Sequence, residues 1–90
     1  MEPVEVTVEF YGIPRQRAKR AELTVTAWTV GQLVAAIETA CPELASLTAS
    51  DGQLRPQYLL SLDGHEFVTD RQRRLKPGER WLLLSADAGG

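Results

Sequence analysis

An apolar run near the end of the sequence, Trp81-Leu82-Leu83-Leu84, constrains the fold more than any other stretch. In a strand over 80–85, the side chains of Trp81 and Leu83 point to one face and those of Leu82 and Leu84 point to the other. Apolar residues on both faces are typical of a central strand, which has other elements packed around it. We therefore expect this strand in the middle of a sheet.

Two further strands are predicted from strict alternation of apolar and polar side chains. The alternation runs over 4–11 and again over 21–27, which is the pattern of a half-buried strand. Gly12-Ile13-Pro14 interrupts it, and the polar stretch 15–20 is interpreted as the loop of a hairpin. We expect the basic residues of this loop to be solvated at its tip, with contact to an acidic partner as the alternative; they are Arg15, Arg17, Lys19 and Arg20.

A helix is predicted to begin after Thr29. The Thr29 hydroxyl can cap the first turn while Gln32, three residues later, reaches back to complete a capping box. Pro42 marks the end of the helix. Cys41 is interpreted as a small buried hydrophobe, with a nucleophile as the less favoured reading. The apolar stripe that faces the strands consists of Val30, Leu33, Val34, Ile37 and Cys41.

The second half of the chain is predicted to supply the remaining strands. Residues 42–56 form a connector in which Leu44 and Leu47 are tucked under the core, and strands follow over 58–62 and 66–68, joined by an Asp-Gly turn. His65 lies at this turn and is expected to be exposed. Because the chain has no second histidine, and no cysteine at a spacing from His65 that is typical of metal ligands, we expect no metal site.

The composition limits the classes of function. The chain has 90 residues, a formal net charge of -2 and one cysteine, which suits a single domain over 1–90. No overall positive charge favours nucleic acid or an anionic membrane, and no apolar run approaches the roughly 20 residues of a membrane helix. Cys41 has no cysteine to pair with and the first residues do not form a secretory signal, so we expect a cytoplasmic protein.

The order of elements favours one compact α+β architecture. It is a mixed sheet with one main helix packed across one face and the last strand parallel to the first in its middle. This is the ubiquitin-like β-grasp arrangement. We expect a flexible C-terminal tail over 85–90 to follow it.

Three motifs add a family resemblance. The sequence Leu75-Lys76-Pro77-Gly78-Glu79 enters the apolar strand, Asp63-Gly64-His65-Glu66 stands in place of the usual Asn-Gly-Glu, and the chain ends in Gly89-Gly90. Together with the order of elements, they resemble the MoaD/ThiS family of ubiquitin-like sulfur carriers over nearly the whole chain.

The resemblance implies a reaction at Gly90. In that family an E1-like enzyme adenylates the terminal carboxylate with ATP, and a sulfur donor then converts it to a thiocarboxylate for a sulfur-accepting synthase, as in molybdopterin or thiamine biosynthesis. The chain would be a carrier and a co-substrate and not an enzyme. It would bind no cofactor, since the partner uses the ATP. Gly89 and Gly90 would thread the partner's channel because they lack β-carbons.

One departure from the family concerns the residues before the glycines. Small subunits of molybdopterin synthase usually carry prolines and a hydrophobic residue there, whereas this chain has Ser85-Ala86-Asp87-Ala88. Asp87 puts a charge on the tail and leaves open which pathway is served. Two other functions stay open: a ubiquitin-like modifier joined to lysines through Gly90, and a noncovalent β-grasp interaction module.

A partner surface is expected on the sheet. If Trp81 and Leu83 face the helix, then Leu82 and Leu84 face away from it together with Leu59. An apolar strip on an uncovered sheet face is a candidate docking surface. Simple core packing is the alternative, because the sequence does not rank the two faces of the last strand.

Overall fold

The structure, a computed structural model, describes residues 2–44 and 47–86. In this part of the chain a five-stranded mixed sheet has the order β2-β1-β5-β3-β4. The elements in chain order are β1 (Val4–Phe10), α1 (Ile13–Ala18), β2 (Glu22–Ala27), α2 (Val30–Ala40), the 3-10 turn η1 (Pro42–Leu44), β3 (Tyr58–Leu62), β4 (Glu66–Phe67) and β5 (Arg80–Ser85).

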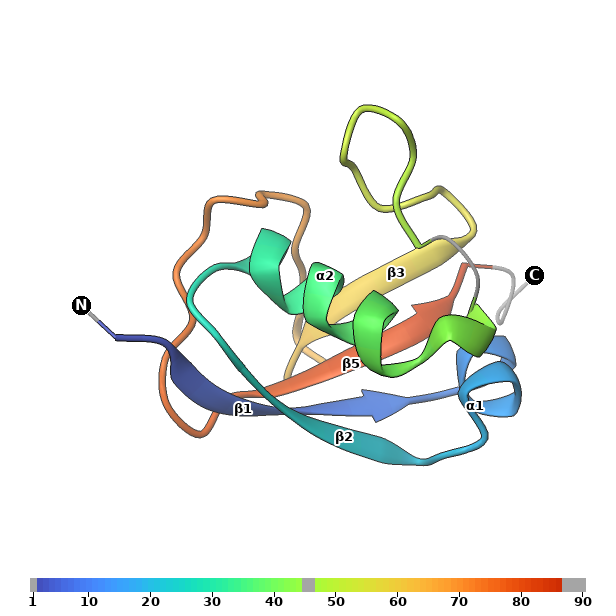
Figure 1. Ribbon diagram of the computed structural model, residues 1–90, viewed down its shortest axis with the longest axis horizontal. Coiled ribbons are helices and arrows are strands. Elements are labelled where there is room, and N and C mark those ends of the chain that lie inside the picture. The colour runs from blue at the N-terminus through green and yellow to red at the C-terminus, as the bar shows by residue number, and fades with distance from the viewer. Residues whose placement is uncertain (1, 45–46, 87–90) are drawn as a thin grey trace.

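Strand β5 occupies the middle of the sheet, as the apolar run predicts (Figure 1). It runs parallel to β1, with Val8 opposite Trp81, and antiparallel to β3, with Leu60 opposite Leu83. The β1–β2 pair is antiparallel, which confirms the predicted pairing of the two alternating strands. The β-grasp arrangement expected from the order of elements is therefore present.

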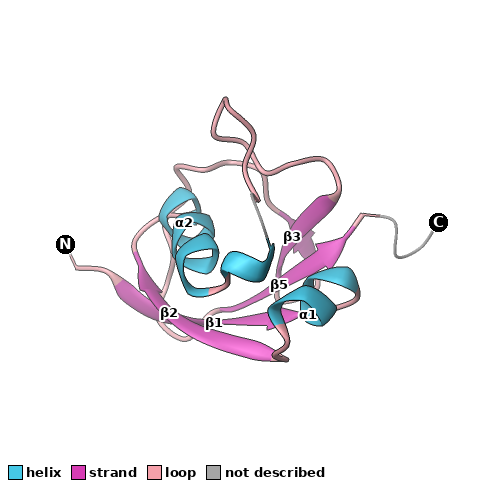
Figure 2. Ribbon diagram, turned by 45° about the vertical axis from the view of Figure 1, so that its right-hand side comes forward, coloured by secondary structure: helices cyan, strands magenta, loops and turns pink. Residues whose placement is uncertain are grey.

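Helix α2 lies across one face of the sheet (Figures 1 and 2). Its cap is close to the predicted one: the Thr29 hydroxyl accepts a hydrogen bond from the Gln32 amide at 3.3 Å. The Gln32 side chain reaches back to the amide of Trp28 at 2.9 Å, one residue before the cap. Two of the free amides at the start of the helix region are thereby satisfied. No helix in 2–44 or 47–86 is long and apolar enough to cross a membrane.

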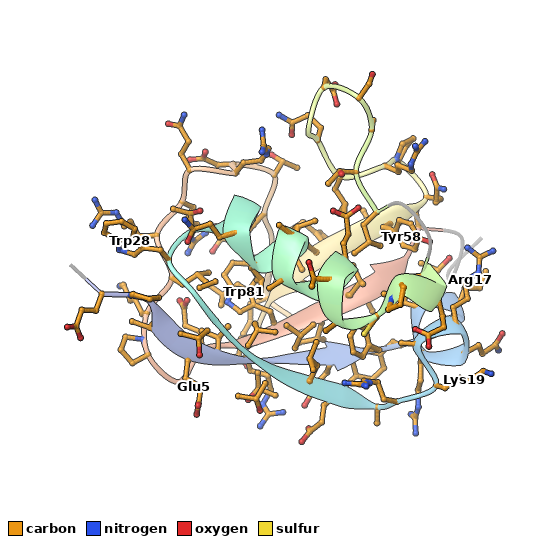
Figure 3. All side chains as sticks on the ribbon, viewed as in Figure 1. Glu5, Arg17, Lys19, Trp28, Tyr58 and Trp81 are labelled. Carbon is orange, nitrogen blue, oxygen red and sulfur yellow. The ribbon has the colours of Figure 1, made fainter. Side chains whose placement is uncertain are left out.

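The core lies between α2 and the sheet. Trp81 and Leu83 are fully buried on the α2 side, and Figure 3 shows Trp81 beneath α2 with Glu5 of β1 pointing to the opposite face. Leu44 and Leu47 are fully buried as predicted. The other buried residues on the helix and on the adjoining strands include Val6, Val8, Phe10, Val25, Leu33, Ile37, Cys41 and Leu60.

The predicted loop over 15–20 is wrong, because helix α1 occupies most of it. Pro14 lies in the first turn of α1, where its missing amide hydrogen costs nothing. Pro14 and Ala18 are buried, and the helix packs against η1 and β5. Lys19 ends α1 in the left-handed conformation, at φ 60°. The basic residues of 15–20 thus belong to a packed helix and its end.

Candidate functional site

The first part of the site is the end of β5, from which the chain continues to the terminal glycines. Ser85 is buried and pairs with Tyr58 of β3, and the Ala86 amide donates to the Gln57 carbonyl at 2.8 Å. The predicted strand over 80–85 is therefore confirmed, and Ser85, which the predicted tail also includes, is part of the sheet. Residues 87–90 lie outside the described residues, and so do the predictions for Asp87, Gly89 and Gly90.

Helix α1 stands beside this strand end. A β-carbon added to Gly12, just before α1, would lie 3.8 Å from the Ser85 β-carbon. Arg17 donates from Nη1 to the Tyr58 hydroxyl at 3.3 Å, and the same hydroxyl donates to the Leu44 carbonyl at 3.4 Å. Figure 3 shows Arg17 and Tyr58 at one end of the molecule. Tyr58 thus links α1, η1 and β3 where β5 ends.

The second part is the sheet face opposite α2. Leu59 is the register partner of Leu84, and Leu82 lies opposite Ser61. The three leucines are only half-buried, whereas Trp81 and Leu83 on the other face are fully buried. The predicted division of the β5 side chains between the two faces is confirmed. The docking role of Leu59, Leu82 and Leu84 stays a prediction.

Two exposed aromatic residues extend this apolar strip, and the sequence reasoning missed both. Tyr11, 40% exposed, follows β1 and donates its amide to the Leu83 carbonyl at 3.1 Å. Phe67, 66% exposed, lies opposite Ser61 at the outer edge of the sheet. The alternation over 4–11 puts Tyr11 on the same face as Glu5 and Glu9, so the sequence contained a signal for its position. Phe67 had no such signal, since β4 is too short for a pattern.

An ion pair borders the strip on the β1 side. Glu9, the β1 register partner of Leu82, accepts from the Arg80 guanidinium and from the Tyr11 hydroxyl at 2.6 Å. The hydrogen bond from Tyr11, followed by the Arg80 guanidinium, holds the pKa of Glu9 below its usual value. The same hydrogen bond raises the pKa of Tyr11. The apolar strip therefore has a charged and hydrogen-bonded rim.

The other reactive residue types lie apart from the strip. Cys41 is buried, as predicted, and burial raises the pKa of its thiol, which disfavours the thiolate that a nucleophile requires. His65 is exposed at the β3–β4 turn, as predicted, with Nε2 3.9 Å from a carboxylate oxygen of Asp63. Within 2–44 and 47–86, no group of three or more histidine, cysteine or acidic residues is placed to hold a metal ion.

Comparison with solved structures identifies the fold. The small archaeal modifier protein SAMP1 from Haloferax volcanii matches with a TM-score of 0.82 and 21% identity, over 96% of this chain and 99% of that chain. Small archaeal modifier protein 1 from Methanosarcina acetivorans matches with a TM-score of 0.82 and 18% identity, over 100% of both chains. A putative molybdopterin converting factor subunit 1 from Pyrococcus furiosus matches with a TM-score of 0.74 and 18% identity, over 91% of this chain and 97% of that chain.

This chain has the ubiquitin-like β-grasp fold of MoaD-like proteins. The predicted fold class is thereby confirmed, and so is the structural side of the resemblance to MoaD/ThiS proteins. No protein-family model matches the sequence, and no curated protein matches it.

Proposed function

We propose that this chain is a ubiquitin-like sulfur carrier that works through the α-carboxylate of Gly90. The observation that carries the proposal is the position of Gly89-Gly90, shortly after the central strand of a fold shared with small archaeal modifiers and a putative molybdopterin converting factor subunit. A reactive terminus needs a rigid support that a partner enzyme can recognise. The sheet that holds β5 supplies this support.

The proposed chemistry begins with the low reactivity of a carboxylate toward nucleophiles. An E1-like enzyme transfers AMP from ATP to the Gly90 carboxylate, and pyrophosphate leaves. A sulfur donor then attacks the acyl adenylate, and AMP leaves. Sulfide gives the thiocarboxylate directly, whereas a protein persulfide gives an acyl disulfide, from which a thiol releases the thiocarboxylate as a new disulfide forms. The thiocarboxylate passes its sulfur to a sulfur-accepting synthase. The chain is a co-substrate in each step, because the partners supply the nucleotide, the base and the sulfur.

Glycines suit the last two positions for a steric reason. An active site that admits only the end of another protein must be narrow, and a residue without a β-carbon passes where others collide. We propose that Gly89 and Gly90 enter the partner's channel while the folded domain stays outside. The charge of Asp87 would then lie at the channel entrance and favour a partner with a basic rim.

The open sheet face is the proposed docking surface for the E1-like enzyme. Leu59, Leu82 and Leu84 form an apolar centre, and Glu9 with Arg80 forms a charged edge. Protein interfaces commonly have an apolar centre surrounded by a polar rim. A partner that covers this face would hold the domain close to the end of β5, within reach of the terminal glycines.

A lysine modifier is the second candidate, and the solved structures that match favour it. Two of the three structures described above are small archaeal modifier proteins. In this case the activated Gly90 carboxylate forms an amide with a lysine of a target protein and loses AMP or a thiol. A noncovalent interaction module is the third candidate, and its function would survive deletion of Gly90.

One experiment separates the three functions. A tagged copy would be purified under denaturing conditions from the native cell, together with a variant that lacks Gly90. Intact mass would show a thiocarboxylate if the chain carries sulfur, and a denaturing gel would show a ladder of conjugates if it modifies lysines. Both signals should vanish in the variant. Retention of the cellular function without Gly90 would support the noncovalent module and contradict the carrier.

A further inference from the structure

A cavity of about 240 Å³ opens between α2, β3 and two loops, 48–56 and 68–71. Its wall is largely apolar, and α2, the first loop, β3 and the second loop each contribute to it. Figure 1 shows the first loop rising beside α2 and β3. The cavity shares Tyr58 with the site at the end of β5, and Leu59 and Phe67 with the apolar strip, while Leu82 and Leu84 do not line it. Its apolar wall includes Val30, Val34, Leu54, Leu60 and Val68.

Arg71 is held at the rim of this cavity by its backbone. Its carbonyl accepts a hydrogen bond from the Gly31 amide at 2.9 Å, in the first turn of α2. Two residues later, the Arg73 carbonyl accepts a hydrogen bond from the Val30 amide at 3.0 Å. These bonds fix the second loop to the start of the helix. The helix amides at Val30 and Gly31 are therefore already used and are not free to bind an anion.

The Arg71 side chain then crosses to the first loop, where a glycine makes room for it. A β-carbon added at Gly52 would lie 2.7 Å from Nη1 and 3.0 Å from Cζ of Arg71, so any other residue would displace the guanidinium. Gly52 also has a positive φ of 83°, which favours glycine. No carboxylate in 2–44 or 47–86 lies within ion-pair distance of this guanidinium.

We propose that this cavity binds an acidic segment of another protein, with one aromatic side chain inserted between α2 and β3 and a neighbouring carboxylate paired with Arg71. A guanidinium that forms no ion pair with the described carboxylates, on a residue whose backbone is held in place, can recognise a carboxylate through two parallel hydrogen bonds. An apolar cavity beside it recognises the ring. Because the cavity and the guanidinium are adjacent, they favour a partner segment in which an aromatic residue stands next to Asp or Glu.

The volume of the cavity and the exposure of Phe67 favour a polypeptide over a free small molecule. The cavity, at about 240 Å³, is smaller than the roughly 300–1,000 Å³ of most small-molecule sites. It is larger than the engineered apolar cavity of about 150 Å³ that holds benzene, so one aromatic ring fits. Phe67, on the cavity wall, remains 66% exposed. A ligand confined to the cavity would cover only the part of Phe67 that lines it, whereas a chain continuing from the ring can cover more of this exposed side chain.

The test uses the full chain labelled with 15N and a capped peptide, acetyl-Asp-Phe-Glu-amide. The first control is the same peptide with alanine in place of phenylalanine, and the second is 3-phenylpropionate, which offers the same ring and carboxylate as a small molecule. The test variant is Arg71→Gln. The native Arg71 side chain is exposed, so its replacement does not disturb the core. The matched variant is Arg20→Gln, another exposed arginine, located between α1 and β2.

The peptide should shift the amide signals of Gly31, Gly52 and Val68 in a saturable manner. Arg71→Gln should weaken its binding about tenfold, as expected for loss of a charged hydrogen-bonded pair, and Arg20→Gln should leave it unchanged. The alanine peptide should not bind, and 3-phenylpropionate should bind more weakly than the peptide.

Four results would overturn the proposal. They are no shift of these amides at millimolar peptide, equal binding of the alanine peptide, equal affinity of the Arg71→Gln chain, and tighter binding of 3-phenylpropionate. The last would assign the cavity to a small molecule. None of the readouts involves Gly90, so failure here would leave the proposed carrier chemistry standing, and failure of that chemistry would leave this site standing.

Discussion

Leu84 and Leu59 face each other across the antiparallel β5–β3 pair, on the side of the sheet that α2 leaves open. Directly opposed residues of such a pair have β-carbons about 5 Å apart, so the two side chains form one apolar unit. Both are half-buried. Leu84 directly precedes Ser85, the last residue of β5. The pair is therefore close to the segment that leads to Gly90.

Leu84→Glu should block activation by the cognate E1-like enzyme while the domain stays folded. A buried apolar anchor at the centre of an interface is worth about 2 kcal/mol or more, so kcat/KM for adenylation should fall by at least roughly thirtyfold. The rate is measured by ATP–pyrophosphate exchange. Circular dichroism and urea unfolding would show whether the fold is kept.

Thr24→Glu is the matched control for this substitution. Thr24 is exposed on the outer strand β2 and pairs with Thr7, so the variant adds the same charge to the sheet away from the leucines. It should be activated like the unchanged chain. Equal activation of Leu84→Glu would remove the open face from the docking surface.

Titration of Glu9 should report its hydrogen bond with Tyr11. The pKa of Glu9 is lowered by this bond and by Arg80, so its stabilising effect is present at neutral pH and is lost as the pH falls through the folded-state pKa. The pKa of Tyr11 is raised by Glu9, so its effect is lost only as the pH rises through that pKa. In Tyr11→Phe, carboxyl NMR should show the Glu9 pKa moving upward; an unchanged value would contradict the role of this bond.

Glu38→Ala should destabilise the fold by detaching the connector after α2. The Glu38 carboxylate accepts from the amides of Leu47 at 2.9 Å and Thr48 at 3.3 Å, and Leu47 is fully buried. Loss of an acceptor for partly buried amides costs about 1–3 kcal/mol. Urea unfolding should show this loss, and Glu43→Ala, at an exposed glutamate in η1, should change stability little. Equal stability of the two variants would contradict the anchoring role.

Thr29→Ala should lower stability by about 1 kcal/mol, since the hydroxyl caps α2 through the Gln32 amide. Thr39→Ala offers a contrast within the same helix. Thr39 is exposed and bonds back to the Ala35 carbonyl, and alanine favours the helix more than threonine does. Thermal unfolding should therefore separate the two variants, and a similar loss in both would contradict the cap.

The regular elements could be predicted because their patterns are local. Alternation in β1 and β2 and the cap at Thr29 each depend on residues close in sequence. The central place of β5 followed from its apolar residues on both faces. The sequence could not show which face of β5 is left open. That depends on α2, which covers the side of Trp81 and Leu83 and leaves Leu82 and Leu84 on the open face.

Helix α1 and the burial of Ser85 depended on distant contacts. The local pattern indicates a strand breaker at Pro14, although proline also begins helices, and the short α1 is stabilised by packing against η1 and β5. Ser85 is polar and stands in both the predicted strand and the predicted tail, and its pairing with Tyr58 buries it. The place of Arg71 at the cavity depends on the approach of its side chain to Gly52 in another loop, which no sequence pattern encodes.

The most direct test of the carrier proposal is top-down mass spectrometry of the protein isolated from its native cell. No thiol reductant is added during the isolation. The proposal predicts that one oxygen is replaced by sulfur in part of the population, and that fragmentation locates the sulfur in the piece that ends at Gly90. The signal should disappear when the E1-like enzyme is deleted. A terminus that carries only the ordinary carboxylate under sulfur-replete growth, with or without that enzyme, would contradict the proposal.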